Sequence, residues 1–286
     1  MKVEILAADS MGTRSMATYI ETKDVSILVD PATALGPKRY RLPPHPTEEK
    51  KLKEHWKKIK KYAKKSDVLI VTHYHYDHHN PEEFLEIYKD KKVFVKHPKE
   101  NINKSQTKRA SVFLKKIEGL AEEIIYSDGK EFDFKDTKIK FSPAVFHGTN
   151  SRLGYVTEVF VKDSEKSFLH TSDVEGPAIK DQLDFILDNC PEIIFADGPM
   201  TYMLGFRYSY DNMNKSIENL LQIIKKCKPE YLILDHHFLR DLKWKQRIEK
   251  LYEQSGDTKV VCAAEFMGQS VETLEAHRKE LCKKDK

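Results

Sequence analysis

The sequence predicts an α+β protein in which strands and helices are interspersed along 286 residues. Short apolar runs that are rich in β-branched residues and bounded by charge, such as residues 68–71, predict buried strands. Longer stretches in which apolar residues recur at helical spacing, such as residues 47–65, predict amphipathic helices. A chain of this length suits one or two domains and can bury a large core.

The composition favours no particular partner. Lysine and arginine total 49 against 45 for aspartate and glutamate, and the net charge of +4 gives no basis for nucleic-acid binding. The high share of charged residues, rich in lysine and glutamate, is typical of thermophile proteins. No early apolar run resembles a signal peptide and none could span a bilayer, so we expect a soluble, cytoplasmic protein with no membrane partner.

The four cysteines lie far apart, and no two of them have the C-x-x-C spacing. The sequence therefore indicates neither a zinc ribbon nor a redox dithiol. We interpret all four as buried or incidental thiols. They are Cys190, Cys227, Cys262 and Cys282.

The first 30 residues predict a set of strands. Apolar runs at residues 3–7, 16–22 and 25–29 predict three strands, and the last of them ends at Asp30. The polar residues 9–15 predict the turn between the first two strands.

Residues from about 36 to 65 predict an irregular and helical excursion from these strands. Four prolines between residues 36 and 46 indicate an irregular segment. Thr47 is the predicted N-cap of a basic helix that continues to about Lys65. Its lysines could face an anionic partner, but such a run of charge is more often a solvated helix face.

The stretch from Asp67 to Pro81 contains a dense cluster of residues that can bind metal ions. Four histidines and an aspartate follow a predicted buried strand within seven residues. Where a strand ends, residues two apart can point the same way, so His73 and His75 can bind one ion while Asp77 and His78 reach a second. Imidazole and carboxylate are ligands that zinc prefers. A solvated, histidine-rich turn is the alternative interpretation.

After this stretch, predicted helices and strands alternate to the C-terminal end. Predicted helices cover residues 81–88, 178–189, 211–227, 242–254 and 271–282, and residues 100–119 are predicted to be polar at first and then helical. Predicted strands cover residues 93–96, 123–126, 131–134, 137–141, 154–161, 167–170, 193–196, 231–234 and 259–263. The predicted buried stripe of the helix at 100–119 consists of Val112, Phe113, Ile117 and Leu120.

The motif His73-x-His75-x-Asp77-His78 resembles the H-x-H-x-D-H signature of the metallo-β-lactamase superfamily. This resemblance implies a four-layered αββα sandwich, with metals at the edge between its two sheets. It also implies that residues 1–286 form a single domain of this kind.

The resemblance further implies three later ligands in a fixed order. They are His147, the bridging Asp173 and His236, each of which follows an apolar run. The run Leu-Ile-Leu-Asp-His236, with Arg240 four residues later, is similar to the last motif of the tRNA-processing endonuclease ribonuclease Z. His237 is the alternative to His236. As a whole, the chain resembles a functionally uncharacterised archaeal branch of the superfamily.

The implied site holds two divalent metal ions. One ion would be bound by His73, His75 and His147 and the other by Asp77, His78 and His236, with Asp173 and a solvent molecule between them. Asp30 would support these ligands from behind, although an ordinary Asp-Pro turn explains it equally well. His79 would support the site through hydrogen bonds, or be a tolerated exposed residue.

The implied reaction is hydrolysis by a bridging hydroxide. Two cations about 3.5–4 Å apart lower the pKa of a shared water toward 7. Asp173 would bridge the cations, and Asp77 would orient the hydroxide or carry a proton to the leaving group. Zinc is the default metal, while iron and manganese suit similar ligands. The redox-active di-iron branch of the superfamily usually has glutamate at the position of His75, and the histidine here therefore argues against an oxidase.

The substrate and the oligomeric state stay open. A small ester, thioester, amide or phosphoester is the first expectation. A phosphodiesterase or nuclease acting on RNA or nucleotides is an alternative, although the chain has no long glycine-rich arm for docking tRNA. Further alternatives are a mononuclear iron dioxygenase of the same fold and a metal-stabilised binding protein. In the loop at residues 200–209, Tyr202, Arg207 and Tyr208 are predicted substrate contacts, with simple loop packing as the alternative.

Overall fold

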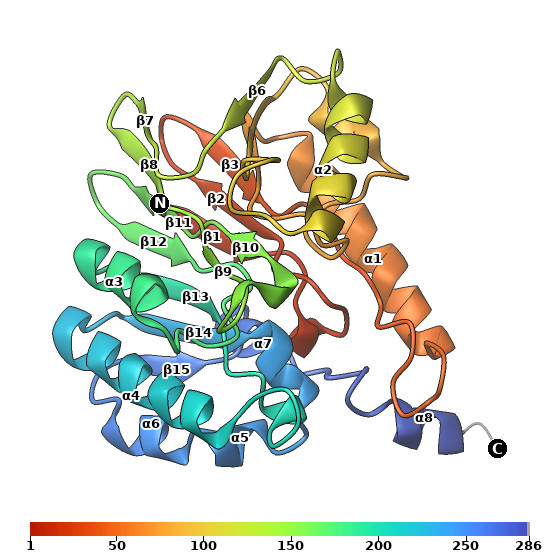
Figure 1. Cartoon of the computed structure of the whole chain (residues 1–286), viewed down its shortest axis with the longest axis vertical. Coiled ribbons are helices and arrows are strands. Elements are labelled where there is room, and N and C mark those ends of the chain that lie inside the picture. The colour runs from red at the N-terminus through yellow and green to blue at the C-terminus, as the bar shows by residue number, and fades with distance from the viewer. Residues whose placement is uncertain (285–286) are drawn as a thin grey trace.

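The computed structural model describes residues 1–284, which fold into four layers with two sheets packed between two sets of helices (Figure 1). The first sheet has the strand order β1-β2-β3-β4-β5-β6. Its strands are β1 (Lys2–Ile5), β2 (Thr18–Glu21), β3 (Ser26–Val29), β4 (Val68–Val71), β5 (Lys92–Val95) and β6 (Glu123–Tyr126). Strands β1 to β3 pair antiparallel, and β3 to β6 pair parallel.

The second sheet has the strand order β15-β14-β13-β12-β11-β8-β7. Its strands are β7 (Glu131–Phe134), β8 (Thr137–Phe141), β11 (Val159–Lys162), β12 (Ser167–His170), β13 (Ile193–Asp197), β14 (Tyr231–Asp235) and β15 (Lys259–Val261). Strands β12 to β15 pair parallel. A separate antiparallel pair consists of β9 (Val145–Phe146) and β10 (Tyr155–Val156).

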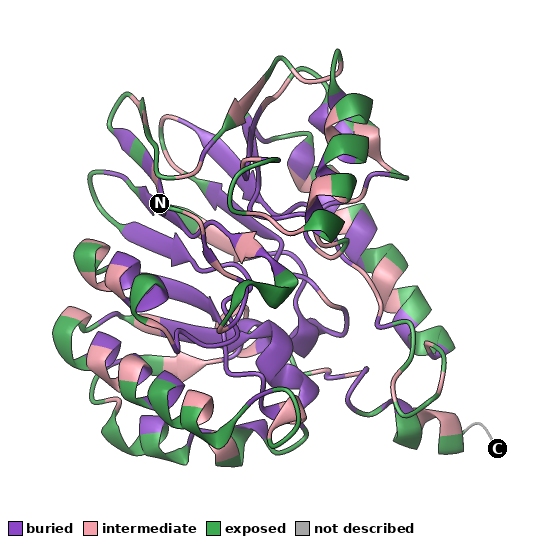
Figure 2. Ribbon diagram, viewed as in Figure 1, coloured by how far each residue is buried: buried purple, intermediate pink, exposed green. Residues whose placement is uncertain are grey.

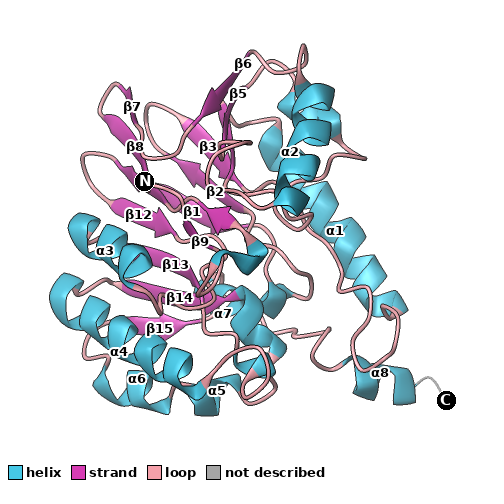
Figure 3. Ribbon diagram, in the orientation of Figure 1, coloured by secondary structure: helices cyan, strands magenta, loops and turns pink. Residues whose placement is uncertain are grey.

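Helices cover the outer face of each sheet (Figure 3). The first sheet is covered by α1 (Pro46–Ala63) and α2 (Lys104–Ile117), and the second by α3 (Lys180–Asn189), α4 (Tyr210–Cys227) and α6 (Glu249–Gln254). The shorter α-helices are α5 (Trp244–Arg247), α7 (Ala263–Phe266) and α8 (Arg278–Lys284). The 3-10 helices are η1 (Asp9–Met11), η2 (Leu85–Tyr88), η3 (Ser151–Leu153), η4 (Thr201–Met203) and η5 (His236–Arg240). No helix within residues 1–284 is both long and apolar enough to cross a membrane.

Strand β4 shows why the central strands are continuous apolar runs. All four of its residues are buried, because one face meets the second sheet and the other meets the helices (Figure 2). Val68 and Ile70 belong to the same core cluster as residues of the second sheet, whereas Leu69 and Val71 pack in the cluster that includes α1 and α2. This two-sided burial fixes the position at which β4 ends and the histidine-rich stretch begins.

The structure confirms the predicted α+β class and the four-layered sandwich. Several predicted strands agree with the structure to the residue, among them β6, β7, β8 and β12. Several other sequence-based predictions differ from the structure.

The N-cap of α1 is His45 and not Thr47. Nδ1 of His45 accepts a hydrogen bond from the backbone N–H of Thr47, and the Glu48 carboxylate accepts one from the backbone N–H of His45. Pro46 then occupies the first helical position, where a missing N–H costs nothing. The proline-rich segment therefore starts the helix earlier than predicted.

The helix predicted at residues 81–88 is reduced to the short η2. The side chain of Asn80 accepts hydrogen bonds from the backbone N–H groups of Glu82 and Glu83, which forms a turn in place of a helix start. Phe84 then has φ of 61°, a left-handed conformation that no α-helix accommodates.

The last two predicted helices are also shorter in the structure. The helix predicted at 242–254 is divided at Ile248, whose φ of −120° and ψ of 21° are not helical, into α5 and α6. The helix predicted at 271–282 begins only at Arg278.

In α2, Val112 does not belong to the buried stripe, because its side chain is 39 % exposed. Its neighbour Phe113 is fully buried, as expected for residues about 100° apart around a helix.

The interpretation of all four cysteines as thiols is wrong. Cys190, at the C-terminal end of α3, forms a disulfide with Cys227, the last residue of α4. Cys262 and Cys282 are free. The bonded pair is 37 residues apart, and such a pairing cannot be deduced from one sequence.

Candidate metal centre

The candidate ligands meet at one edge of the sandwich because each follows the end of a strand. His73 to His78 follow β4, His147 follows β9, Asp173 lies beyond β12 and His236 follows β14. Parallel strands end at a common edge of their sheet, so residues remote in sequence converge there.

The backbone around these residues is held in unusual conformations. Asp30, Ser172, Glu175 and His236 all have positive φ, between 48° and 59°. Such values are uncommon outside glycine and cluster at functional sites. Gly148 has φ of 73°, and a Cβ atom there would lie 2.5 Å from the Glu175 carboxylate. Only glycine lets these two segments approach so closely.

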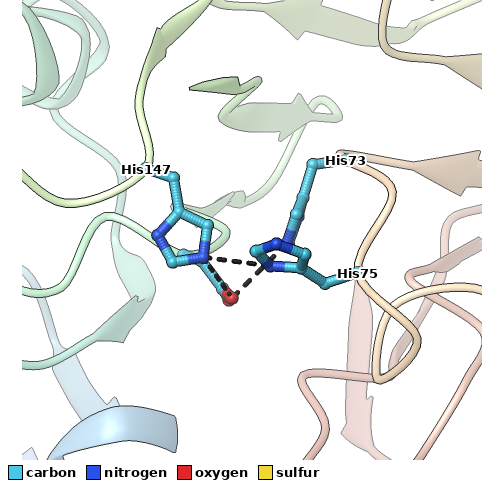
Figure 4. A group of neighbouring side chains, drawn as sticks. His73, His75 and His147 are labelled. Carbon is cyan, nitrogen blue, oxygen red and sulfur yellow. Dashed lines mark hydrogen bonds and ion pairs between the residues drawn. The ribbon is translucent and has the colours of Figure 1, made fainter. Parts of the chain in front are cut away.

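The first group of candidate ligands is His73, His75, His147 and Asp173, whose potential ligand atoms all lie within 4.8 Å of one another. Nε2 of His147 lies 3.2 Å from Nδ1 of His75 and 3.2 Å from Oδ2 of Asp173. Nε2 of His73 lies 3.4 Å from the same Asp173 oxygen. Figure 4 shows the three imidazoles turned toward one another, with His147 approaching from the side opposite His73 and His75.

The second group is Asp77, His78 and His236, again within 4.8 Å. Nε2 of His78 lies 3.0 Å, and Nε2 of His236 3.3 Å, from Oδ1 of Asp173. Nε2 of His236 lies 3.6 Å from Oδ2 of Asp77. The two oxygens of Asp173 are thus divided between the two groups.

The donor atoms fit divalent cations. Nε2 of His73, Nε2 of His78 and Oδ1 of Asp173 are buried and make no hydrogen bond within the described chain. Buried polar atoms normally have a partner, and an ion is one explanation for such a gap. Neutral imidazole and carboxylate are also a donor set that suits zinc.

Carboxylates behind the histidines orient their rings. Asp30 accepts a hydrogen bond from Nδ1 of His78 at 2.8 Å, and Asp9 accepts one from Nδ1 of His236 at 2.8 Å. Both contacts leave Nε2 directed at the centre, as ligating histidines require. Asp30 is a predicted support of the ligands, whereas Asp9 is not, because it lies in a segment expected to be a polar turn.

Two further supports surround the first group. Nδ1 of His147 lies 3.5 Å from Glu175, which the sequence analysis also missed, although it follows Asp173 by only two residues. His79 is fully buried, and its Nδ1 donates a hydrogen bond to the His75 carbonyl oxygen at 2.9 Å. His79 is therefore not a tolerated exposed residue, because it holds the turn that carries His75.

The structure brings both His236 and His237 to the cluster. His236 groups with Asp77 and His78, whereas His237 forms a separate group with Asp173 and His236. Nδ1 of His237 donates a hydrogen bond to Oδ2 of Asp197 at 2.9 Å. Asp197, the last residue of β13, is a further residue that the sequence analysis did not single out.

Charges within the centre are strongly coupled. Burial, together with the neighbouring His78, lowers the pKa of His73 to about 3 despite the nearby Asp173 carboxylate. Burial opposes the charged form of His78, but Asp173 and Asp30 outweigh it and raise its pKa to about 10. In the same way Asp173 and Glu175 overcome burial and raise the pKa of His147 to about 9. Without a metal, the centre therefore holds protons where cations would bind.

Of the three predicted substrate contacts, Tyr202 is the one that the structure connects to the centre, through Arg240. The Tyr202 ring lies 6.0 Å from Cζ of Arg240, whose Nη2 is 3.9 Å from Asp77. Tyr208 is buried, and its hydroxyl donates to the Asn212 carbonyl oxygen. The exposed Arg207 lies against Phe206.

Among the described residues, no hydrogen bond or ion pair joins Arg207 or Tyr208 to the candidate ligands. Their contact with a substrate stays a prediction.

Comparison with known proteins agrees with this geometry. The family model of the metallo-β-lactamase superfamily matches residues 12–237. The UPF0282 protein of Korarchaeum cryptofilum is 55 % identical over 283 residues, covering 98 % of this chain and 94 % of the relative.

Solved structures share the fold at low identity. The metallo-β-lactamase fold protein YhfI of Bacillus subtilis is 14 % identical with a TM-score of 0.55, over 90 % of this chain and 94 % of that one. A metallo hydrolase of Ignicoccus hospitalis is 17 % identical with a TM-score of 0.50, over 94 % and 95 %. The chain therefore belongs to the metallo-β-lactamase superfamily and, within it, to the archaeal UPF0282 proteins.

Proposed function

We propose that this protein is a metal-dependent hydrolase whose site holds two divalent ions, with zinc as the first candidate. The observation that carries the proposal is the division of Asp173: Oδ2 lies by the His73 and His147 nitrogens, and Oδ1 by those of His78 and His236. A carboxylate placed in this way would bridge two cations and offset their mutual repulsion.

The remaining residues have distinct parts in the proposed reaction. When bound, the two ions would lower the pKa of a shared water toward neutrality and polarise the bond under attack. Burial opposes ionisation of Asp77, but His78 and His236 hold its pKa below the usual range, so the carboxylate is charged at neutral pH. Its side chain is 17 % exposed, which allows it to accept a proton from the nucleophile and pass it to the leaving group.

The class of ester, thioester, amide or phosphoester is the first substrate expectation, with phosphodiesters of RNA or nucleotides as the alternative. A mononuclear iron dioxygenase is less well supported, because Asp77, His78 and His236 provide a second complete group of donors. Hydrolysis is therefore preferred to a dioxygenase reaction.

Metal analysis combined with a panel of ester and phosphodiester substrates tests the proposal. We expect two zinc ions per chain and hydrolysis of at least one substrate class. Asp173→Ala and the milder Asp173→Asn should each lower metal content and reduce turnover by at least about 100-fold, because the bridge is lost. Asp136→Ala, at an exposed aspartate, serves as the matched control. Full activity with two bound ions in both Asp173 variants would show the proposal to be wrong.

A further inference from the structure

Three arginines, Arg14, Arg39 and Arg240, are neighbours near the candidate centre, and two of them form ion pairs within the protein. Arg14 makes two hydrogen bonds of 2.6 Å to the carboxylate of Glu275. Arg240 donates from Nε to Asp9 at 2.7 Å. The third, Arg39, makes no ion pair with any carboxylate in residues 1–284. Its positive charge is therefore uncompensated by the described chain.

The guanidinium of Arg39 is nevertheless held in place. Cζ of Arg39 lies 4.8 Å from the ring centroid of Tyr40 and 4.8 Å from that of Tyr202. Nη2 donates a hydrogen bond to the Arg240 carbonyl oxygen at 3.0 Å and is the only guanidinium nitrogen with an acceptor among residues 1–284. Nε is buried without a partner in the same described region. Most of the hydrogen-bonding capacity of this cation is thus left unused.

The segment that carries Arg39 is a tight turn. The backbone N–H of Arg39 donates to the Leu42 carbonyl oxygen, and Leu42 returns the bond to Arg39. Tyr40 and Arg41 between them have φ of 54° and 64°, as in the two-residue turns that join paired strands. Tyr40 is fixed at its far end, where its hydroxyl donates to the Ala276 carbonyl oxygen. The turn therefore presents Arg39 with a defined orientation.

Arg39 is connected to the second group of candidate ligands through neighbouring residues, because the Arg240 carbonyl oxygen accepts its hydrogen bond. The Tyr202 ring that it contacts also lies 6.0 Å from Cζ of Arg240, and Nη2 of Arg240 is 3.9 Å from Asp77. Arg240 and Tyr202 thus link Arg39 to the second group of candidate ligands.

We propose that Arg39, steadied by Tyr40 and Tyr202, binds an oxyanion of the substrate, a carboxylate or phosphate group, beside the bond that is hydrolysed. The proposal rests on the proposed function and narrows its substrate class to anionic molecules. A guanidinium matches the geometry of both oxyanions and can donate two parallel hydrogen bonds to either. Aromatic rings on a guanidinium hold it without neutralising it.

Titration of the zinc-loaded protein with inorganic phosphate, and separately with succinate, by calorimetry tests this proposal. Arg39→Gln should weaken binding of the preferred oxyanion about tenfold, since hydrogen bonds to charged groups are among the stronger ones. Arg39→Lys should retain part of the affinity, because lysine keeps the positive charge but lacks the paired N–H donors of a guanidinium. Comparison of the two probes separates a phosphate from a carboxylate preference.

Arg41→Gln is the matched control, because it removes an equal charge from the same turn at an exposed residue. It should leave both affinities unchanged. An equal loss in Arg41→Gln would reduce the effect to general electrostatics and overturn the proposal, as would unchanged binding in Arg39→Gln.

Two measurements separate this proposal from the hydrolase proposal. Arg39→Gln should keep the zinc content and melting temperature of the original protein, so that its loss of binding is not a loss of the centre. The same titrations on metal-free protein should still show a weaker affinity for Arg39→Gln. A protein that binds no zinc but shows this difference would refute the dinuclear site and leave the Arg39 site standing.

Discussion

At the scale of single residues, the candidate centre depends on carboxylates that touch no metal position themselves. Asp30 accepts hydrogen bonds from the backbone N–H and the hydroxyl of Thr72 as well as from His78. This one side chain therefore fixes both the end of β4 and the ring of a candidate ligand.

Replacement of this carboxylate by an amide tests its role. In Asp30→Asn, an amide N–H faces the N–H of His78 unless one of the two groups turns away, so the ring loses its orientation. We expect zinc affinity to fall 10- to 100-fold, as measured by competition with a chromophoric chelator. Asp67→Asn is the control, because Asp67 accepts from Ser26 at the opposite end of β4. Equal zinc affinity in both variants would contradict the assigned role.

At the scale of elements, the disulfide joins the ends of α3 and α4, the helices that cover the second sheet. Neither helix end has another covalent restraint. Because the bond closes a loop of 37 residues, it restricts the unfolded chain substantially.

Removal of this bond should lower stability without altering the centre. In the Cys190→Ser, Cys227→Ser double variant we expect the free energy of unfolding in denaturant to fall by about 2–4 kcal/mol. A reductant should lower the stability of the original protein similarly and leave the double variant unchanged. Cys282→Ser, at a free cysteine, should have little effect. Insensitivity of the original protein to reductant would exclude this contribution.

At the scale of the whole molecule, metal binding and proton binding should compete. Without metal, His78 with a pKa of about 10 and His147 with a pKa of about 9 each carry a proton at neutral pH. Zinc needs the unprotonated nitrogen, so its uptake should release protons and its affinity should rise with pH.

This competition predicts opposite pH trends for the two forms of the protein. The stability that these two histidines give the metal-free protein is full below about 6.5, the ordinary histidine pKa, and is lost as pH rises through 9 and 10. The additional stability from zinc should grow over the same range. Calorimetry in buffers of different ionisation enthalpy measures the released protons, and a pH-independent zinc affinity would contradict the prediction.

Local patterns predicted the central strands and the cluster after β4, whereas the layers were expected only from the resemblance to the superfamily. Val68 to Val71 is apolar at every position, and His73 to His78 are neighbours on the turn that follows. Asp9 could not be predicted in the same way, since it lies 227 residues from His236 and its segment carries no periodic signal. The disulfide and the isolation of Arg39 likewise depend on which distant segments pack together.

The hydrogen bond between Asp9 and His236 has a consequence for the design of shortened variants of this protein. Asp9 lies before residue 12, where the match to the superfamily description begins, yet it orients a proposed ligand and pairs with Arg240. A shortened protein beginning at Gly12 would keep all seven proposed ligands. It would nevertheless lose the Asp9 carboxylate that orients the ring of His236. The start of the superfamily match therefore excludes a residue on which the orientation of a proposed ligand depends.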